Sequence, residues 1–239
     1  MKSKKKRTRR KWKIKVLVVY AVALFFIIFG IKTAVVKIAS KIQERQPEEE
    51  FTEEVKKENA DFVGAPPFTV DLLDINEYSR PGIALEKING IVIHYTANPG
   101  STAKQNRDYF EGLKDSHETK ASSHFVVGID GEIIQCIPSS EISYASNSRN
   151  VDTLSIECCH KDESGKFTKE TYQSLVELVG WLCQRFGLTS DQVIRHYDVT
   201  GKNCPKYFVE HEKKWEQFKK DVDAQIIVVE QEVEAANQK

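Results

Sequence analysis

Residues 90–95, with the sequence Gly-Ile-Val-Ile-His-Tyr, decide the fold of this chain. A short apolar run rich in β-branched residues predicts a buried strand. The run Pro99-Gly100-Ser101-Thr102 comes directly after it, where it interrupts the strand and offers a cap for a following helix. The histidine therefore stands at the end of a buried strand, beside a loop, where functional side chains are often carried.

Further strands and helices are predicted on both sides of this strand. A helix is expected over 103–114, and Asp130-Gly131 predicts a hairpin between strands 123–129 and 132–137. A strand at 153–158, an amphipathic helix at 168–186, a strand at 192–196 and a closing helix with Trp215 and Phe218 follow. Beyond Asp221 we expect the acidic chain to fray. This order predicts an α/β fold, a mixed β-sheet flanked by helices.

The charge of the chain is divided unevenly along its length. Lys plus Arg and Asp plus Glu both number 35, but residues 1–15 hold ten basic residues and no acidic one. The other residues therefore hold 25 basic and 35 acidic side chains, a net charge of −10. A protein that binds nucleic acid usually carries its positive charge on the folded domain. Nucleic acid is thus not expected as a partner.

An uncharged run at 16–31, VLVVYAVALFFIIFGI, predicts a single transmembrane helix near the N-terminus. It would span about 24 Å, and snorkelling of Lys15, Lys32 and Lys37 extends the apolar span to residue 36. A buried helix or a cleaved signal peptide are the alternatives, although the residues at the candidate cleavage sites are unsuitable. The basic flank predicts a cytoplasmic N-terminus in the cell membrane, with the remaining chain outside the cytoplasm.

These observations predict five segments in the chain. They are a basic cytoplasmic tail at 1–15, a transmembrane anchor at 16–36, a charged linker at 37–67, a folded domain at 68–222 and an acidic tail at 223–239. The linker is rich in charge and poor in large apolar residues, and two prolines stiffen its end.

Cysteine usage leaves two alternatives open. The chain has five cysteines and no Cys-x-x-Cys pair. An odd number is unusual for an exported domain and is resolved if one of them binds a metal. The other four are either free and buried or paired: Cys136, Cys158, Cys159 and Cys183. The adjacent Cys158 and Cys159 should point to opposite faces of the sheet.

Two histidines and a cysteine are candidate metal ligands. His94 and His196 each end a predicted strand, and Cys204 lies in the loop that follows His196. Two imidazoles and a thiolate are a suitable ligand set for zinc, and three protein ligands leave a fourth position open, as in catalytic zinc sites. The alternative for each residue is a hydrogen-bonded histidine or a buried thiol in the core.

Four sequence motifs carry a resemblance to a known family. The motifs are IVIHYTANPGST (91–102), ASSHFVVGIDGEIIQCIP (121–138), NVDTLSIECCH (150–160) and VIRHYDVTGKNCP (193–205). Together they resemble the zinc-dependent N-acetylmuramoyl-L-alanine amidases of type 2, the superfamily that includes the peptidoglycan recognition proteins. The resemblance covers about 68–222, implies Zn²⁺ held by His94, His196 and Cys204, and makes this segment a zinc amidase domain.

The resemblance also implies roles for three other side chains. Glu157 matches the family's general acid/base, and Lys202 matches a lysine that stabilises the oxyanion; the alternatives are a solvent-facing Glu and a solvated loop Lys. His124 matches a His-aromatic pair and is a candidate for contact with the metal ligands or the substrate, or else a core residue. One branch of the family has a Tyr where this chain has Ser123, which increases the demand on Glu157.

The implied function is a membrane-anchored amidase that cleaves the bond between N-acetylmuramic acid and L-alanine in peptidoglycan during cell-wall remodelling. A non-catalytic peptidoglycan-binding module of the same fold is the alternative, and family members of that kind typically lack the cysteine found at 204. A membrane-tethered structural protein would leave the metal ligands unexplained. Loop position alone makes Asn98 and Asn147 candidates for contact with glycan or peptide, and no motif supports a role for His117, His160 or His211, which are expected on the surface.

Overall fold

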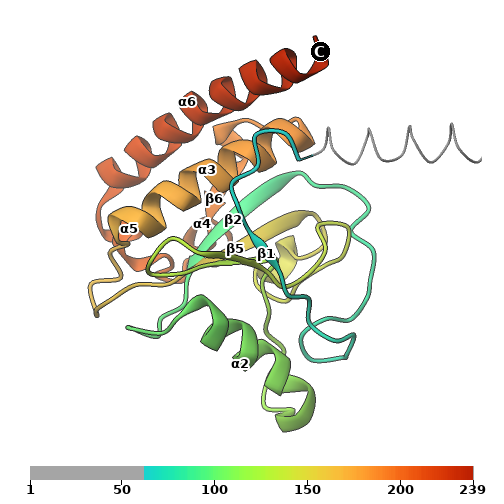
Figure 1. Cartoon of the computed structure of the whole chain (residues 1–239). Coiled ribbons are helices and arrows are strands. Elements are labelled where there is room, and N and C mark those ends of the chain that lie inside the picture. Colours follow the sequence, from blue (N-terminus) through green and yellow to red (C-terminus); the bar gives the residue numbers. More distant parts are fainter. Residues whose placement is uncertain (1–61, 239) are drawn as a thin grey trace, which may run out of the picture. The chain divides into compact units, whose positions relative to one another are not determined.

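The computed structural model describes residues 62–238, which contain a six-stranded β-sheet with helices on both faces (Figure 1). In chain order the elements are β1 Thr69–Val70, β2 Gly90–Tyr95, α2 Ala103–Ser116, β3 Phe125–Val127, β4 Ile133–Gln135, η1 Asn147–Arg149, β5 Thr153–Cys158, α3 Lys169–Phe186, η2 Ser190–Gln192, β6 Val193–Arg195, α4 His196–Thr200, α5 Lys206–Glu210 and α6 Glu212–Asn237. The predicted α/β fold is confirmed for this part of the chain.

The strands form a mixed sheet with the order β1-β4-β3-β5-β2-β6. All neighbouring strands are parallel except β3 and β4, which form the predicted antiparallel hairpin. Gly131 in its turn has φ 87°, a left-handed conformation that glycine adopts without strain. Strand β2 lies between β5 and β6, so its end is covered on both sides by the ends of parallel neighbours.

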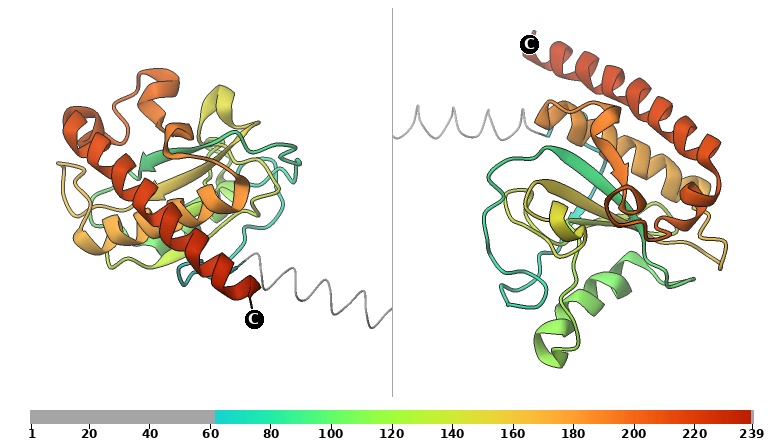
Figure 2. Two further views of the ribbon diagram at one scale, coloured as in Figure 1. Left: turned by 90° about the horizontal axis from the view of Figure 1, so that it is seen from above. Right: turned by 180° about the vertical axis from the view of Figure 1, so that it is seen from behind.

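Helices α3 and α6 cover one face of the sheet and α2 covers the other (Figures 1 and 2). Ile91, Ile93 and Ile156 point into the larger core beneath α3 and α6, while Val126 and Ile134 point into the smaller core beneath α2. Cys158 belongs to the first core and Cys159 to the second, as the strand alternation predicted.

The C-terminal helix α6 continues well beyond Asp221, so the prediction that the chain frays there is wrong. The helix runs to Asn237 and buries Val222 and Val229. Val229 packs so closely that a Cβ added at Gly64 would lie 2.7 Å from its Cγ1 atom. An acidic composition on the solvent-facing side does not prevent a helix from forming when its apolar stripe is buried.

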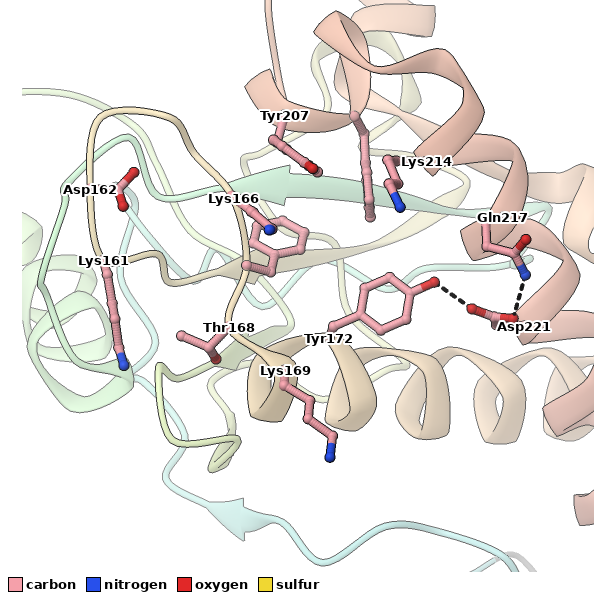
Figure 3. Close-up of a pocket in the computed structure, with 12 residues that line it drawn as sticks. Lys161, Asp162, Lys166, Thr168, Lys169, Tyr172, Tyr207, Lys214, Gln217 and Asp221 are labelled. Atoms are coloured by element: carbon pink, nitrogen blue, oxygen red, sulfur yellow. Dashed lines mark hydrogen bonds between the residues drawn. The ribbon is translucent and has the colours of Figure 1, made fainter.

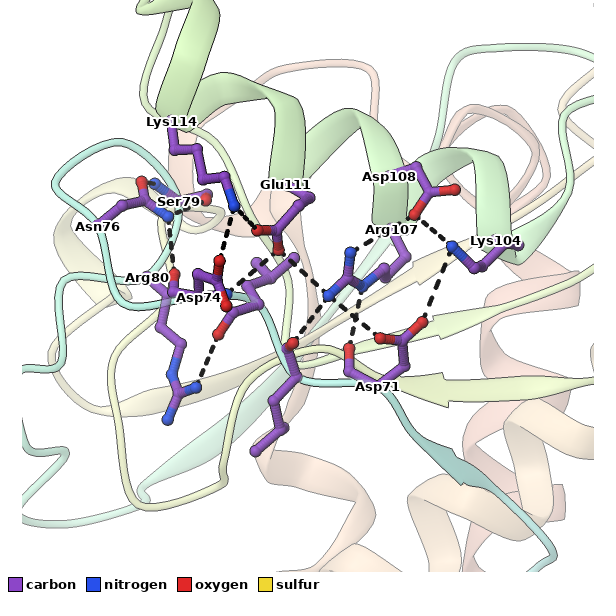
Figure 4. Close-up of polar contacts among 12 residues, drawn as sticks. Asp71, Asp74, Asn76, Ser79, Arg80, Lys104, Arg107, Asp108, Glu111 and Lys114 are labelled. Atoms are coloured by element: carbon purple, nitrogen blue, oxygen red, sulfur yellow. Dashed lines mark hydrogen bonds and ion pairs between the residues drawn. The ribbon is translucent and has the colours of Figure 1, made fainter.

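Helix α2 is joined to the segment before β2 by a group of ion pairs (Figure 4). The Arg107 guanidinium donates to the backbone oxygens of Asp71 and Leu72 and forms ion pairs with Asp71 and Glu111, both at 3.1 Å. Lys114 bridges Glu111 and Asp74. Exposed ion pairs contribute little, but Arg107 is buried and satisfies two backbone carbonyls, so it fixes α2 against this segment.

The predicted transmembrane anchor at 16–36 lies outside the described residues, as do the basic tail at 1–15 and most of the linker. Among residues 62–238, no helix combines the length and the apolar composition needed to cross a membrane.

The aromatic contacts of α6 lead to a stability prediction. Phe218 is fully buried and contacts the rings of Phe208 and Trp215, with centroids 5.3 and 5.4 Å apart. We expect Phe218→Ala to lower the free energy of unfolding by about 3–5 kcal/mol. Ile227→Ala, on the same helix but 54% exposed, should change it by less than about 0.5 kcal/mol. Urea unfolding followed by tryptophan fluorescence measures both, and equal effects would contradict this packing.

Candidate metal centre

The three predicted ligands meet at one edge of the sheet although they lie far apart in sequence. His94 is the next-to-last residue of strand β2, and His196 is the first residue of α4, directly after the neighbouring strand β6. Cys204 lies in the loop between α4 and α5. Because β2 and β6 are parallel and adjacent, their carboxyl ends bring both imidazoles to the same place.

The donor atoms of His94, His196 and Cys204 lie close enough to hold one metal ion. One ligand atom from each residue lies within 4.8 Å of the others, and all three residues are buried. The Cys204 Sγ is 3.9 Å from the His94 Nδ1, and the two imidazole rings have centroids 4.6 Å apart. No other group of this kind occurs among residues 62–238. The structure thus brings together the residues that the sequence analysis selected.

The chemistry of these donors fits a zinc ion. Burial lowers the pKa of both imidazoles, and in His94 the neighbouring His196 and Lys202 lower it further, so both rings are neutral and have a lone pair to donate. The His196 Nδ1 is buried and has no hydrogen-bond partner among the described residues, which is costly unless another group occupies that position. Burial, reinforced by Glu157, raises the pKa of Cys204 to about 12, so a bound metal must displace the thiol proton.

The other ring nitrogens of the two histidines contact a loop that the sequence analysis did not connect with the metal. The His196 Nε2 is 2.9 Å from the side-chain oxygen of Asn147, and the His94 Nε2 is 3.2 Å from the Ser146 hydroxyl. From its loop position alone, the sequence predicts for Asn147 only a contact with glycan or peptide. No sequence pattern connects this loop with His94 and His196, because the contacts span 52 and 49 positions.

Glu157 lies beside His94 on the same face of the sheet. The two residues are direct partners in the parallel pairing of β2 with β5, and such partners point to the same side. The Glu157 Oε2 atom is buried without a hydrogen-bond partner in the described region. Burial raises the pKa of this carboxyl group to about 8, although the Lys202 charge opposes the shift. The side chain is therefore not the solvent-facing Glu of the alternative interpretation.

Lys202 is an exposed residue in the loop between α4 and α5 that also contains Cys204, and its positive charge acts on the groups of the metal centre. Its ammonium group lowers the pKa of both histidines and of Glu157. A cation in that position favours negative charge in the site.

His124 lies in the core, which is one of the two placements that the sequence allows. It is fully buried, accepts a hydrogen bond from the Ser155 backbone N–H and donates from Nε2 to the Glu141 carbonyl at 2.8 Å. Burial lowers its pKa to about 4, so it remains neutral. None of its hydrogen-bond partners is a candidate metal ligand.

One of the remaining histidines is placed differently from the prediction. His117 and His211 are exposed, as expected, but His160 is buried. Its ring stacks on Tyr95, with centroids 5.1 Å apart, and its Nδ1 lies 2.8 Å from the Asp162 carbonyl. The prediction of a surface residue was wrong because the residue follows the end of β5, where the loop turns back over Tyr95.

The four cysteines outside the metal centre are free and buried, which decides between the two alternatives. Burial raises the pKa of Cys136, Cys159 and Cys183 to about 12 and that of Cys158 well above its usual value. These thiols are neutral, and neutral buried thiols are unreactive.

A cavity of about 660 Å³ lies between the loop after β5 and helices α3, α5 and α6 (Figure 3). Lys166 and Lys214 line it together with Asp162 and Asp221, so its charges are mixed. Tyr172 donates a hydrogen bond to Asp221 across its floor. The candidate metal ligands and Glu157 are not among its lining residues.

Comparison with known proteins agrees with this geometry. The sequence model of the N-acetylmuramoyl-L-alanine amidase family, Amidase_2, matches residues 84–207, which include all three candidate ligands. The chain belongs to this family.

Proteins similar to this chain in sequence are found in Bacillus species. The N-acetylmuramoyl-L-alanine amidase CwlL of Bacillus licheniformis is 37% identical over 167 residues, which cover 64% of this chain and 46% of that protein. The N-acetylmuramoyl-L-alanine amidase BlyA of Bacillus subtilis (strain 168) is 32% identical over 180 residues, covering 66% and 47%. The chain thus spans about half the length of the curated relatives it matches.

Solved structures share the fold. The catalytic domain of XlyA superimposes with a TM-score of 0.57 at 24% identity, covering 66% of this chain and 99% of that one. A mutant endolysin from Bacillus subtilis gives a TM-score of 0.56 at 25% identity, covering 65% and 98%.

The ligand geometry leads to a metal-binding prediction. The purified chain should bind one zinc ion, and Cys204→Ser should weaken binding because a hydroxyl group is a much poorer ligand than a thiolate. Zinc content measured by elemental analysis after dialysis tests this. Cys183→Ala removes a buried thiol in α3 and serves as the control that keeps its zinc. Full zinc content in the double variant His94→Ala, Cys204→Ser would show that the metal binds elsewhere.

Proposed function

We propose that this chain is a zinc-dependent N-acetylmuramoyl-L-alanine amidase that hydrolyses the amide bond between N-acetylmuramic acid and L-alanine in peptidoglycan. The observation that carries the proposal is the convergence of His94, His196 and Cys204 in a chain of this family. Relatives at 32–37% identity are named as amidases of this kind.

The residues around the metal centre supply what amide hydrolysis requires. A zinc ion held by the three ligands would polarise the substrate carbonyl and lower the pKa of a water molecule toward 7. A zinc ion beside Glu157 would favour its carboxylate form, which is placed to take the proton from the attacking water and to deliver it to the departing L-alanine nitrogen. Its position beside His94 and its free Oε2 support this role. Lys202 stabilises the negative charge that develops on the substrate carbonyl oxygen.

A direct assay separates catalysis from binding alone. Incubation of the full chain with muropeptides should release free stem peptide with an L-alanine N-terminus, and removal of the metal by a chelator should stop the release. Added zinc should restore it. Binding of muropeptides without any release, in zinc-loaded protein, would favour the non-catalytic peptidoglycan-binding module of the same fold.

The location of the enzyme is part of the proposal. The apolar run 16–31 with its basic flank supports a single membrane anchor, an N-terminus in the cytoplasm and an amidase domain outside it. This arrangement would hold the enzyme at the outer face of the cell membrane, next to peptidoglycan, where it would act in cell-wall remodelling.

Reporter fusions test this topology. A reporter that is active only outside the cytoplasm should work when it is fused after residue 45 and fail when it is fused before residue 16, because the ten basic residues oppose export of that end. N-terminal sequencing of the mature protein is the companion measurement. A mature N-terminus near residue 40 would instead indicate a cleaved signal peptide.

Replacement of Glu157 tests the proton-transfer role. Glu157→Gln is nearly isosteric, so zinc content should be unchanged while kcat falls by about 10²–10⁴-fold. KM should change little, because the lost interaction belongs mainly to the transition state. Glu163 is an exposed carboxylate in the loop after β5. The matched control is Glu163→Gln, which should keep the wild-type kcat. A nearly normal kcat for Glu157→Gln with zinc in place would assign the proton transfer to another group.

A further inference from the structure

The loop between β4 and β5 contacts both candidate histidine ligands on the side away from Cys204. Ser146 and Asn147 stand at the start of η1, and each contacts the Nε2 atom of one histidine, His94 and His196 respectively. The Nδ1 atom of His94 instead faces Cys204 at 3.9 Å. The His94 imidazole is therefore contacted at both nitrogens by different parts of the chain, whereas His196 is contacted at Nε2 alone.

The Asn147 contact determines which nitrogen of His196 carries the proton. An amide oxygen can only accept a hydrogen bond, so the His196 Nε2 must donate one at 2.9 Å. In a neutral imidazole the other nitrogen, Nδ1, then has the lone pair. This Nδ1 atom is one of the buried atoms with no partner among the described residues.

The backbone at Asn147 has an unusual conformation. Its φ of 54° lies in the left-handed region, which non-glycine residues seldom adopt and which asparagine tolerates better than most. Such a conformation persists when the surroundings hold it, and it often occurs at functional sites. Here it accompanies a side chain whose oxygen reaches His196.

The loop is held by hydrogen bonds within itself and to the segment directly before β3. The Asn150 side-chain oxygen accepts from the backbone N–H groups of Ala145 and Ser146, at 3.1 and 2.6 Å. The His124 Nε2–H donates to the Glu141 carbonyl at the start of the loop, and Ser122 pairs with Tyr144. These hydrogen bonds hold the loop on either side of Asn147, which is itself an exposed residue.

We propose that Asn147 is a positioning residue for the metal: its side-chain oxygen holds His196 as the Nε2–H tautomer and directs Nδ1 toward the ion. The proposal rests on the metal site proposed above. Partners of this kind orient the ligand, and their loss typically lowers metal affinity by about 10–100-fold.

Two substitutions separate the hydrogen bond from the backbone conformation. Asn147→Gly removes the acceptor and accepts positive φ, whereas Asn147→Asp keeps an acceptor oxygen and also tolerates positive φ. Zinc affinity of the detergent-solubilised full chain is measured by competition with a chromophoric chelator. We expect a loss of about 10–100-fold in Asn147→Gly and no loss in Asn147→Asp. Equal affinity of Asn147→Gly and wild type, or an equal loss in both variants, would overturn the proposal.

A second measurement uses the metal-free wild-type chain and does not depend on the Asn147 variants. Long-range ¹H–¹⁵N correlation spectra distinguish the two imidazole tautomers, and a His196→Gln sample assigns the signals. His196 should be the Nε2–H tautomer in the wild type. A purely structural role of Asn147 would not require this tautomer. A predominantly Nδ1–H tautomer would overturn the proposal even if zinc binds, while failure of the wild type to bind zinc with the Nε2–H tautomer present would overturn the metal site alone.

Discussion

The parallel pairing of β2 with β5 on one side and β6 on the other is the interaction on which the site depends. Register in a sheet determines both which residues are neighbours and which face each side chain occupies. This pairing puts Glu157 beside His94 and brings His196 to the same edge. A shift of one residue in either strand would turn a functional side chain into the core beneath α3 and α6. The buried apolar residues on that face, such as Ile93 and Ile156, oppose such a shift.

Burial of polar atoms is the second constraint, and it is met by the loop between β4 and β5. The His94, His196 and Glu157 side chains have atoms withdrawn from water, and such atoms require partners. Ser146 and Asn147 supply partners for one nitrogen of each ring. Four buried side-chain atoms lack a hydrogen-bond partner in the described region: Thr96 Oγ1, Glu157 Oε2, His160 Nε2 and His196 Nδ1. Two of them, on His196 and Glu157, belong to the residues to which we assign metal binding and proton transfer.

The strands and the three ligands could be predicted from sequence because their signals are local or belong to a recognised set of motifs. Apolar runs such as 90–95 predict strands by composition, and the resemblance selects His94, His196 and Cys204. Other features depend on contacts between distant segments. Burial of His160 results from stacking on Tyr95, and α6 continues to Asn237 because residues near its end pack on the domain. The hydrogen bond from His196 to Asn147 cannot be predicted from the sequence either, because no periodicity relates the two residues.

Cys204 shows why neighbours, and not burial, separate a metal ligand from an ordinary thiol. All five cysteines are buried, and burial raises the pKa of each thiol. Four of them lie among apolar side chains of the two cores, or beside a single amide in the case of Cys159. Only Cys204, among the described residues, has two imidazoles within ligand distance. A zinc ion would offset the cost of forming a thiolate there, because it would provide positive charge and the two neutral imidazoles would supply further ligands. The same fold therefore keeps four thiols inert and makes one available to a metal without using disulfides in this part of the chain.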